Sequence, residues 1–218
     1  MTSLQQEVFN CVFSNDLETI KELLEREETM KDILGAKDEF GRNALMVAGM
    51  MGRSAIVREL LSNGALINEQ TVEGYSSLHF AACWGHLETV RALLELGADT
   101  HAKTFRGEKP VDVARRNSKT DCADYIILTE AKQDLVSYVE SVKDLTTDPE
   151  KNLTKEEKKI CRAACSAKSD WIQSVMNPTV TDFLAQRKDM EETLQPILNK
   201  LSAETVETPG KTLKKSLK

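Results

Sequence analysis

Aromatic residues, glycine and proline are all scarce in this chain of 218 residues, and their scarcity limits the choice of fold. Aromatic residues make up 5% of the chain, so Leu, Val, Ile and Ala must fill its core. With Gly 10 and Pro 5 there are few helix breakers, which favours helices. No apolar run approaches the roughly 18 residues that span a bilayer. Because 40% of the residues are apolar, we expect a mainly helical protein with a packed core and no membrane partner.

Basic charge and metal-binding side chains are also in short supply. The formal net charge of −6 argues against a nucleic-acid partner. The first residues do not combine a basic stretch with an apolar one, as a secretory signal does, so we expect a cytoplasmic protein. Cys161 and Cys165 have a spacing that two zinc ligands could share, but all three histidines lie far upstream. Buried reduced thiols are the favoured interpretation, and we expect no metal and no cofactor.

The chain contains an internal repeat of 33 residues. Glycines recur at this interval at positions 41, 74 and 107. The same interval relates Leu45 to Leu78 and Val111, and Ala48 to Ala81 and Ala114. Agreement at several separate positions indicates a true structural period.

The best-formed copy of the repeat runs from Glu73 to Asp99 and has a readable local structure. Gly74 permits a turn with positive φ, and Ser76 can cap the short helix that follows. A second helix then presents an apolar stripe of Leu87, Val90, Leu93 and Leu94, and Gly97 can end it in the left-handed conformation. One such unit cannot bury its stripe alone, so the copies must stack.

This unit resembles an ankyrin repeat. Ser76-Ser77-Leu78-His79 stands where the family has Thr-Pro-Leu-His, with degenerate counterparts in Asn43–Met46 and Lys109–Asp112. Upstream, Cys11–Leu24 is similar to the helical part of the unit and is interpreted as an N-terminal capping unit, followed by a longer loop through Glu25–Lys31. Asp121–Leu128 supplies the outer helix of the third unit. The resemblance implies a short solenoid over residues 5–130.

The C-terminal third is expected to be helical as well. Ala131–Lys143 has an amphipathic pattern that predicts a helix capping the solenoid, and the polar stretch 144–152 predicts a linker. Thr154 and Glu157 form a capping box at the start of a helix, and a second short helix around Trp171 is expected to end at Asn177-Pro178. A long helix from Val180 to Leu201 should be kinked at Pro196.

Residues 153–201 are similar to the C-terminal helical lid of DnaK-type heat-shock chaperones. The spacing of several residues carries this second resemblance: Cys165, Trp171-Ile172, Phe183, Met190-Glu191, Pro196-Ile197 and Leu201. No ATPase domain or β-sandwich of the chaperone kind precedes them, so the resemblance implies a small helical bundle. A bundle kept for its shape is favoured over one that still handles client proteins.

The expected architecture is therefore all-α: about three ankyrin repeats with an N-terminal capping unit, followed by a small helical bundle. The expected boundaries are 1–143 for the solenoid with its capping helices, 144–152 for the linker, 153–202 for the lid-like bundle and 203–218 for a disordered basic tail.

No catalytic site is recognisable in the sequence. His79 occupies a turn position where imidazole ordinarily bonds to backbone in ankyrin repeats, and Cys83 has no Asn or Asp at a suitable place to orient a histidine. The glycines belong to the repeat and not to a phosphate-binding loop. We therefore do not expect an enzyme.

The ankyrin resemblance instead implies a concave binding surface built from the turns and the first helices. The contact positions are Glu39, Phe40, Arg42, Met50 and Met51 in the first unit; Val72, Glu73, Tyr75, Cys83 and Trp84 in the second; and Phe105, Arg106, Glu108, Arg116 and Asn117 in the third. Aromatic and Arg side chains dominate interface energies, and Trp84 beside Tyr75 is the expected centre. The structural alternative is that Phe40 and Phe105 pack under neighbouring turns.

Two functions are compatible with this reading. The first is a scaffold or adaptor that binds one protein partner on the ankyrin surface and another through the lid-like bundle. The second is a chaperone-linked regulator that engages a chaperone or its clients through the lid-like bundle. The order of the two resemblances is similar to that in one family of ankyrin-repeat proteins, which implies a non-enzymatic protein associated with the cytoskeleton, at the cilium or at the midbody and cleavage furrow of dividing cells.

Overall fold

The computed structural model describes residues 3–25, 33–148, 151 and 153–206, and these residues form an all-α fold. They contain no strand beyond one isolated bridge, between Gln70 and Ser76. The chain divides into two compact units, Met1–Glu130 and Ala131–Lys218. The helices are α1 (Ser3–Ser14), α2 (Leu17–Glu25), α4 (Ala44–Met50), α5 (Ser54–Ser62), α6 (Ser77–Trp84), α7 (Leu87–Glu95), α8 (Pro110–Arg116), α9 (Thr120–Thr147), α10 (Lys155–Ser174) and α11 (Val180–Val206).

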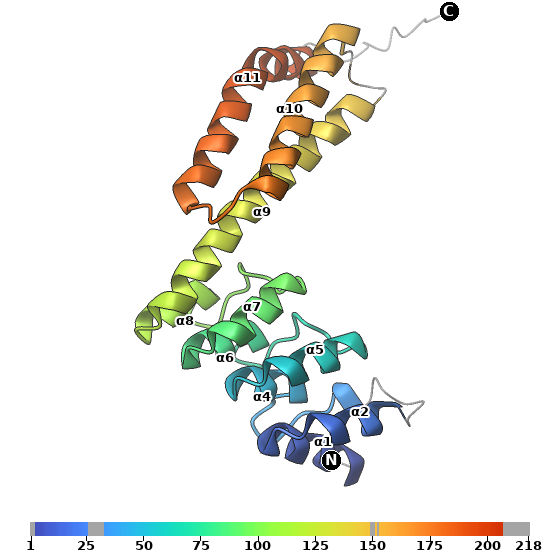
Figure 1. The fold of residues 1–218 in the computed structure, drawn as a ribbon, viewed down its shortest axis with the longest axis vertical. Helices are drawn as coiled ribbons and strands as arrows, with labels where there is room; N and C mark the ends of the chain where they lie inside the picture. Colours follow the sequence, from blue (N-terminus) through green and yellow to red (C-terminus); the bar gives the residue numbers. More distant parts are fainter. Residues whose placement is uncertain (1–2, 26–32, 149–150, 152, 207–218) are drawn as a thin grey trace, which may run out of the picture. The chain divides into compact units, whose positions relative to one another are not determined.

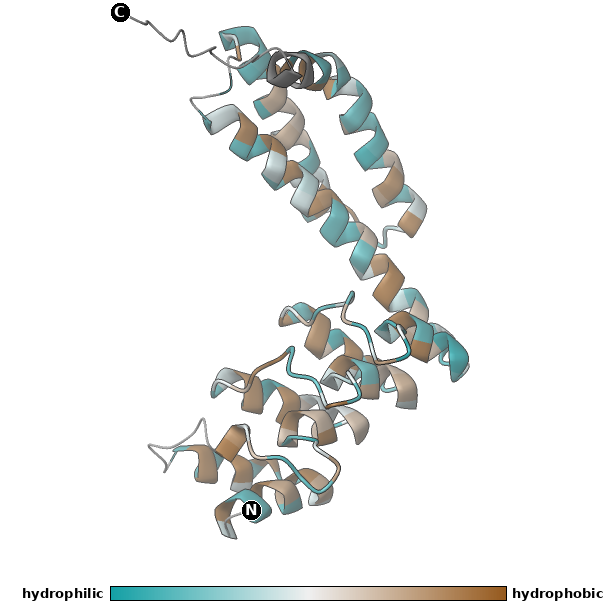
Figure 2. Ribbon diagram, turned by 180° about the vertical axis from the view of Figure 1, so that it is seen from behind, coloured by the Kyte–Doolittle hydropathy of each residue, from teal (hydrophilic) through white to brown (hydrophobic). Residues whose placement is uncertain are grey.

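The first unit is a stack of helix pairs, as the 33-residue period predicts. The pairs are α1 with α2, α4 with α5, α6 with α7, and α8 with the beginning of α9 (Figure 1). One apolar core runs through all of them and includes Ile56, Leu78, Leu93 and Ile126, each almost fully buried. In Figure 2 the apolar residues lie mainly in the helices, whereas the loops between them are largely hydrophilic.

Small residues allow the first helices of successive repeats to approach closely. A Cβ added at Gly49 in α4 would lie only 2.7 Å from the carbonyl oxygen of Ser77 at the start of α6. The expected cap is confirmed, because the Ser76 side chain accepts a hydrogen bond from the His79 backbone N–H. Gly74 and Gly97 both have positive φ, at 80° and 91°, as their positions in the turn and after the second helix predict.

The outer helix of the third repeat does not stop at Leu128, where the sequence pattern predicts its end. α9 continues from Thr120 to Thr147, so the expected separate capping helix 131–143 and the first residues of the expected linker 144–152 are parts of one helix. Its sequence contains neither Gly nor Pro to stop it. Its residues Cys122, Ala123 and Ile126 are buried in the repeat core, whereas the segment from Ala131 onward belongs to the second unit. The structure therefore divides the chain at 130/131 and not at 143/144.

The second unit is formed by the C-terminal part of α9 with α10 and α11. Its buried apolar residues are Ala131, Leu135, Val139, Val142, Cys161, Cys165, Phe183, Met190, Leu194 and Ile197. The thiol of Cys165 donates to the carbonyl oxygen of Val139 at 3.6 Å, and the Trp171 ring meets Phe183 edge-on with 5.3 Å between centroids. The ammonium group of Lys168 joins α10 to α11 through Gln186 and Asp189.

Helices α10 and α11 of the second unit begin as the sequence predicts, but they end later. The capping box of Thr154 and Glu157 is confirmed, with the Thr154 N–H donating to Glu157 at 2.7 Å. The separate short helix expected around Trp171 is wrong, because α10 runs without a break to Ser174. α11 contains Pro196 and changes direction in its C-terminal part (Figure 1). It extends to Val206, four residues past the expected end of the bundle at 202.

Two further expectations fall outside the described residues, namely most of the loop through Glu25–Lys31 and the greater part of the basic tail 203–218. None of the described helices is long and apolar enough to cross a membrane.

Candidate partner-binding surface

The residues expected to contact a partner lie at equivalent positions of successive repeats, on the turns and first helices. None of them is fully buried. The exposed members are Glu39, Phe40, Val72, Glu73, Trp84, Phe105, Arg106 and Arg116, and the half-buried members are Arg42, Met50, Met51, Tyr75, Cys83, Glu108 and Asn117. We call this set the repeat surface.

Three large aromatic side chains on the repeat surface face solvent. Phe40 is 66% exposed, Phe105 is 65% exposed and Trp84 is 58% exposed. The structural alternative, in which Phe40 and Phe105 pack under neighbouring turns, is therefore wrong. An arginine lies over each phenylalanine ring instead, Arg42 at 4.6 Å from the Phe40 centroid and Arg106 at 5.3 Å from that of Phe105.

The expected pairing of Trp84 with Tyr75 is also wrong. Tyr75 precedes the first residue of α6 and Trp84 is its last residue, so a helix of about 12 Å separates them. The ring of Tyr75 stacks on Phe80, with 5.6 Å between centroids and 29° between planes, and contacts His79 edge-on. Sequence reasoning missed Phe80, although the 33-residue period places it in line with Val47 and Val113 on the first helices.

A groove of about 750 Å³ lies between the turns of the first and second repeats, and we call it the turn groove. It is lined by Asp38, Glu39, Phe40, Gly41, Arg42, Thr71, Val72, Glu73, Tyr75 and Phe80. A second depression of about 360 Å³ shares Phe40 and Arg42 and adds Phe13, which is 47% exposed on α1 and was also missed. Phe40 and Arg42 thus form a ridge with a hollow on either side.

The positive charge of Arg42 on this ridge is already neutralised within the protein. Arg42 forms a two-point contact with the Asp38 carboxylate, at 2.8 Å from Nε and 2.7 Å from Nη2. Burial opposes ionisation of Asp38, but hydrogen bonds from the side chain and backbone of Arg42 outweigh it and hold the pKa of Asp38 below its usual value. Within the described residues, no ion pair involves Glu39 or Glu73.

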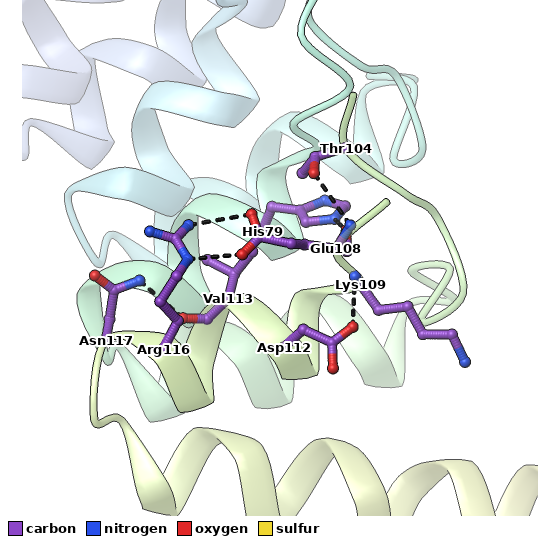
Figure 3. A network of polar contacts seen from close by, with 8 residues as sticks. All are labelled: His79, Thr104, Glu108, Lys109, Asp112, Val113, Arg116 and Asn117. Atoms are coloured by element: carbon purple, nitrogen blue, oxygen red, sulfur yellow. Dashed lines mark hydrogen bonds and ion pairs between the residues drawn. The ribbon is translucent and has the colours of Figure 1, made fainter. Parts of the chain in front are cut away.

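A polar network joins the second repeat to the third (Figure 3). Nδ1 of the fully buried His79 accepts from the Ser76 backbone N–H at 3.1 Å, so Nε2 carries the proton and donates to the Glu108 carbonyl oxygen at 3.2 Å. The Glu108 carboxylate accepts from Arg116 at 2.7 and 3.3 Å. The expected structural role of His79 is thereby confirmed.

The burial of His79 predicts a dependence of stability on pH. Desolvation lowers the pKa of His79 below its usual value, so the unfolded chain takes up a proton at a higher pH than the native one. Stability of the repeats should therefore fall as pH drops below about 6.5, with a limiting slope of about 1.4 kcal/mol per pH unit. Urea titrations at several pH values measure this slope, and His79→Asn should reduce it, whereas His101→Asn, at an exposed histidine, should not. An equal slope in both variants would contradict the assignment.

Known proteins resemble this chain in its repeats and, in two relatives, over most of its length. A family model for ankyrin repeats (three copies) matches residues 8–104. Ankyrin repeat domain-containing protein 45 of Danio rerio is 50% identical over 209 residues, which cover 92% of this chain and 93% of that protein. The Homo sapiens protein of the same name is 36% identical, covering 87% of this chain and 74% of its own length. Synphilin-1 of Mus musculus is 28% identical over 59% of this chain but 14% of its own length.

Proposed function

The chain belongs to the family of ankyrin repeat domain-containing protein 45, and from this premise we propose that it is a non-enzymatic scaffold or adaptor that binds a protein partner on the repeat surface. The observation that carries the proposal is the exposure of Phe40, Trp84 and Phe105 in a chain with 5% aromatic residues. Aromatic side chains and arginine contribute most of the free energy at protein interfaces. Leaving three of the few aromatics in water is costly unless a partner covers them.

The two side chains of the repeats that the sequence offers for chemistry, His79 and Cys83, are engaged or unreactive. His79 is fully buried, and both of its ring nitrogens form hydrogen bonds within the repeats. Burial raises the pKa of the Cys83 thiol, and although Arg116 and Lys119 act in the opposite direction they do not offset it. A thiol with a raised pKa holds little of the nucleophilic thiolate at neutral pH. These properties support a binding role for the repeat surface.

Trp84 offers the sharpest test of the repeat surface. Because it is 58% exposed, Trp84→Ala should leave the melting temperature nearly unchanged. It should weaken partner binding at least about tenfold, or 1.4 kcal/mol. Affinity purification from cell extract with the full chain, followed by mass spectrometry, identifies the partner, and titration with the purified partner gives the affinity of each variant.

The matched control is Leu66→Ala, which truncates a 70% exposed side chain that is not part of the repeat surface. It should change neither the melting temperature nor the affinity. A large fall in melting temperature with Trp84→Ala would place this residue in the core, and an unchanged affinity would place the binding site elsewhere.

The chaperone-linked regulator remains the second candidate. The similarity of residues 153–201 to a chaperone lid stays a prediction, but the second unit exposes Met176 (86%) and Leu184 (52%), which could contact a chaperone or its client. Recovery of a chaperone by the full chain, lowered by Leu184→Asp but not by Trp84→Ala, would favour this function.

We also propose a cytoplasmic location with a cytoskeletal partner at the cilium, or at the midbody and cleavage furrow during division. This proposal rests on the family resemblance alone. Imaging of the tagged chain in ciliated and dividing cells tests it, and uniform staining without enrichment at either structure would contradict it.

A further inference from the structure

The turn groove combines an aromatic floor with two acidic side chains, Glu39 and Glu73, that form no ion pair with any residue the structure describes. We propose that it binds a basic segment of the partner protein, in which lysine or arginine residues flank an aliphatic side chain. This inference rests on the proposed function, because it assigns the chemistry of the partner that the repeat surface would bind.

The floor of the groove is a preformed apolar surface. Tyr75 and Phe80 stack on one another, and the edge contact with the buried His79 fixes Tyr75 from a second direction. Phe40 forms part of one wall, and Val72, which is 98% exposed, forms part of the other. An aliphatic side chain placed between them would lose contact with water, which favours binding in proportion to the apolar area that is buried. Because the rings are already held by packing, little conformational entropy is lost on binding.

Acidic side chains at the edges of the turn groove favour a partner segment that is basic. Glu39 lies on the first turn and Glu73 on the second, so a carboxylate stands on each side of the groove. Both are exposed, and within the described residues neither takes part in an ion pair. Arg42 is the cationic residue of the groove lining, and its guanidinium is already bound by Asp38. The groove therefore attracts cations on both sides of its aromatic floor and repels acidic peptides and nucleic acids.

Synthetic peptides can test this assignment on the full chain without knowledge of the natural partner. One fluorescently labelled peptide alternates lysine with leucine, and its matched counterpart has glutamate in place of every lysine. Fluorescence anisotropy should show saturable binding of the lysine peptide, weakened by added salt, and no binding of the glutamate peptide.

The double variant Glu39→Gln/Glu73→Gln removes both rim charges with little change of shape. Exposed ion pairs are individually weak, so the loss of both rim charges should lower the affinity for the lysine peptide by about two- to thirtyfold. The control Asp124→Asn/Glu140→Gln removes two exposed carboxylates from α9 and should leave the affinity unchanged. Phe40→Ser should weaken binding by removing part of the apolar wall, and because Phe40 is 66% exposed the variant should still fold.

Several outcomes would overturn the inference. They are equal binding of the two peptides, an equal loss of affinity in the control double variant, and a self-associated form that Glu39→Gln/Glu73→Gln dissociates, since a second copy of the chain would then fill the groove. A natural partner whose binding requires Trp84, together with no affinity for the lysine peptide, would overturn this inference and leave the proposed function standing. Lysine-peptide binding that depends on both rim charges would support it even if Trp84 proved irrelevant.

Discussion

Leu78→Ala should lower the free energy of unfolding of the repeats by about 2–5 kcal/mol. Leu78 is 1% exposed and lies on α6, the first helix of the central repeat. The equivalent residues of the flanking repeats, Leu45 and Val111, are 2% and 6% exposed, so the position belongs to a continuous core. Truncation removes buried methyl groups and leaves a cavity that the neighbouring repeats on both sides cannot easily fill.

Urea denaturation followed by circular dichroism measures this loss in the full chain. Leu66→Ala is the matched control, since it removes the same atoms from a side chain that is 70% exposed, and it should change stability by less than about 0.5 kcal/mol. If Leu78→Ala gave an equally small change, Leu78 would not be a core residue and the shared register of the three repeats would be wrong.

The second large effect is expected at Gly74, where Ala should destabilise the repeats by about 2–5 kcal/mol. Gly74 has φ of 80°, a conformation that costs other residues about 1–2 kcal/mol. An added Cβ would also lie 2.7 Å from the carbonyl oxygen of Lys103 and 2.8 Å from Cα of Thr104. These are backbone atoms of the next turn, which hydrogen bonds from Phe105 to the Glu73 carbonyl and from Gln70 to the Lys103 carbonyl hold in place. Relieving the contact would therefore move one repeat away from the next.

Glycines at the equivalent positions of the other repeats are controls that separate the cost of positive φ from the cost of the close contact. Gly41 and Gly107 occupy the equivalent turns with φ of 73° and 76°, but a Cβ at either would meet nothing within 4 Å. Gly41→Ala and Gly107→Ala should thus cost only the conformational part, about 1–2 kcal/mol. The additional loss of stability in Gly74→Ala, compared with these two variants, measures the contact between repeats. An equal loss of stability in all three variants would show that this contact is not tight.

Much of the first unit could be predicted because its signals are local or periodic. The turn at Gly74 and the cap at Ser76 depend on residues within a few positions of one another, as does the cap at Thr154 in the second unit. The 33-residue interval also placed the repeat surface on the turns and first helices. Phe80 could have been found by the same interval, since Val47 and Val113 share its position.

Other features of the repeat surface depend on which side chains meet in space. Tyr75 packs on Phe80 and not near Trp84, and the carboxylate of Asp38 is bound by Arg42, whereas those of Glu39 and Glu73 form no ion pair in the part of the chain that the structure describes. The sequence shows that these residues share a surface but not which of them contact one another. The position of the turn groove and its net charge follow from those contacts.

By itself, the sequence determined the helical class, the repeat, and the turns and caps, because backbone conformation, capping and apolar periodicity act within one unit of the chain. Tertiary structure alone decided where the first unit ends. Ile126 and Leu135 both lie on α9 and look alike in the apolar pattern, yet the first is buried in the repeat core and the second in the other unit. A helical pattern marks which face of a helix must be buried, but the element that covers that face is chosen by packing between segments far apart in the chain.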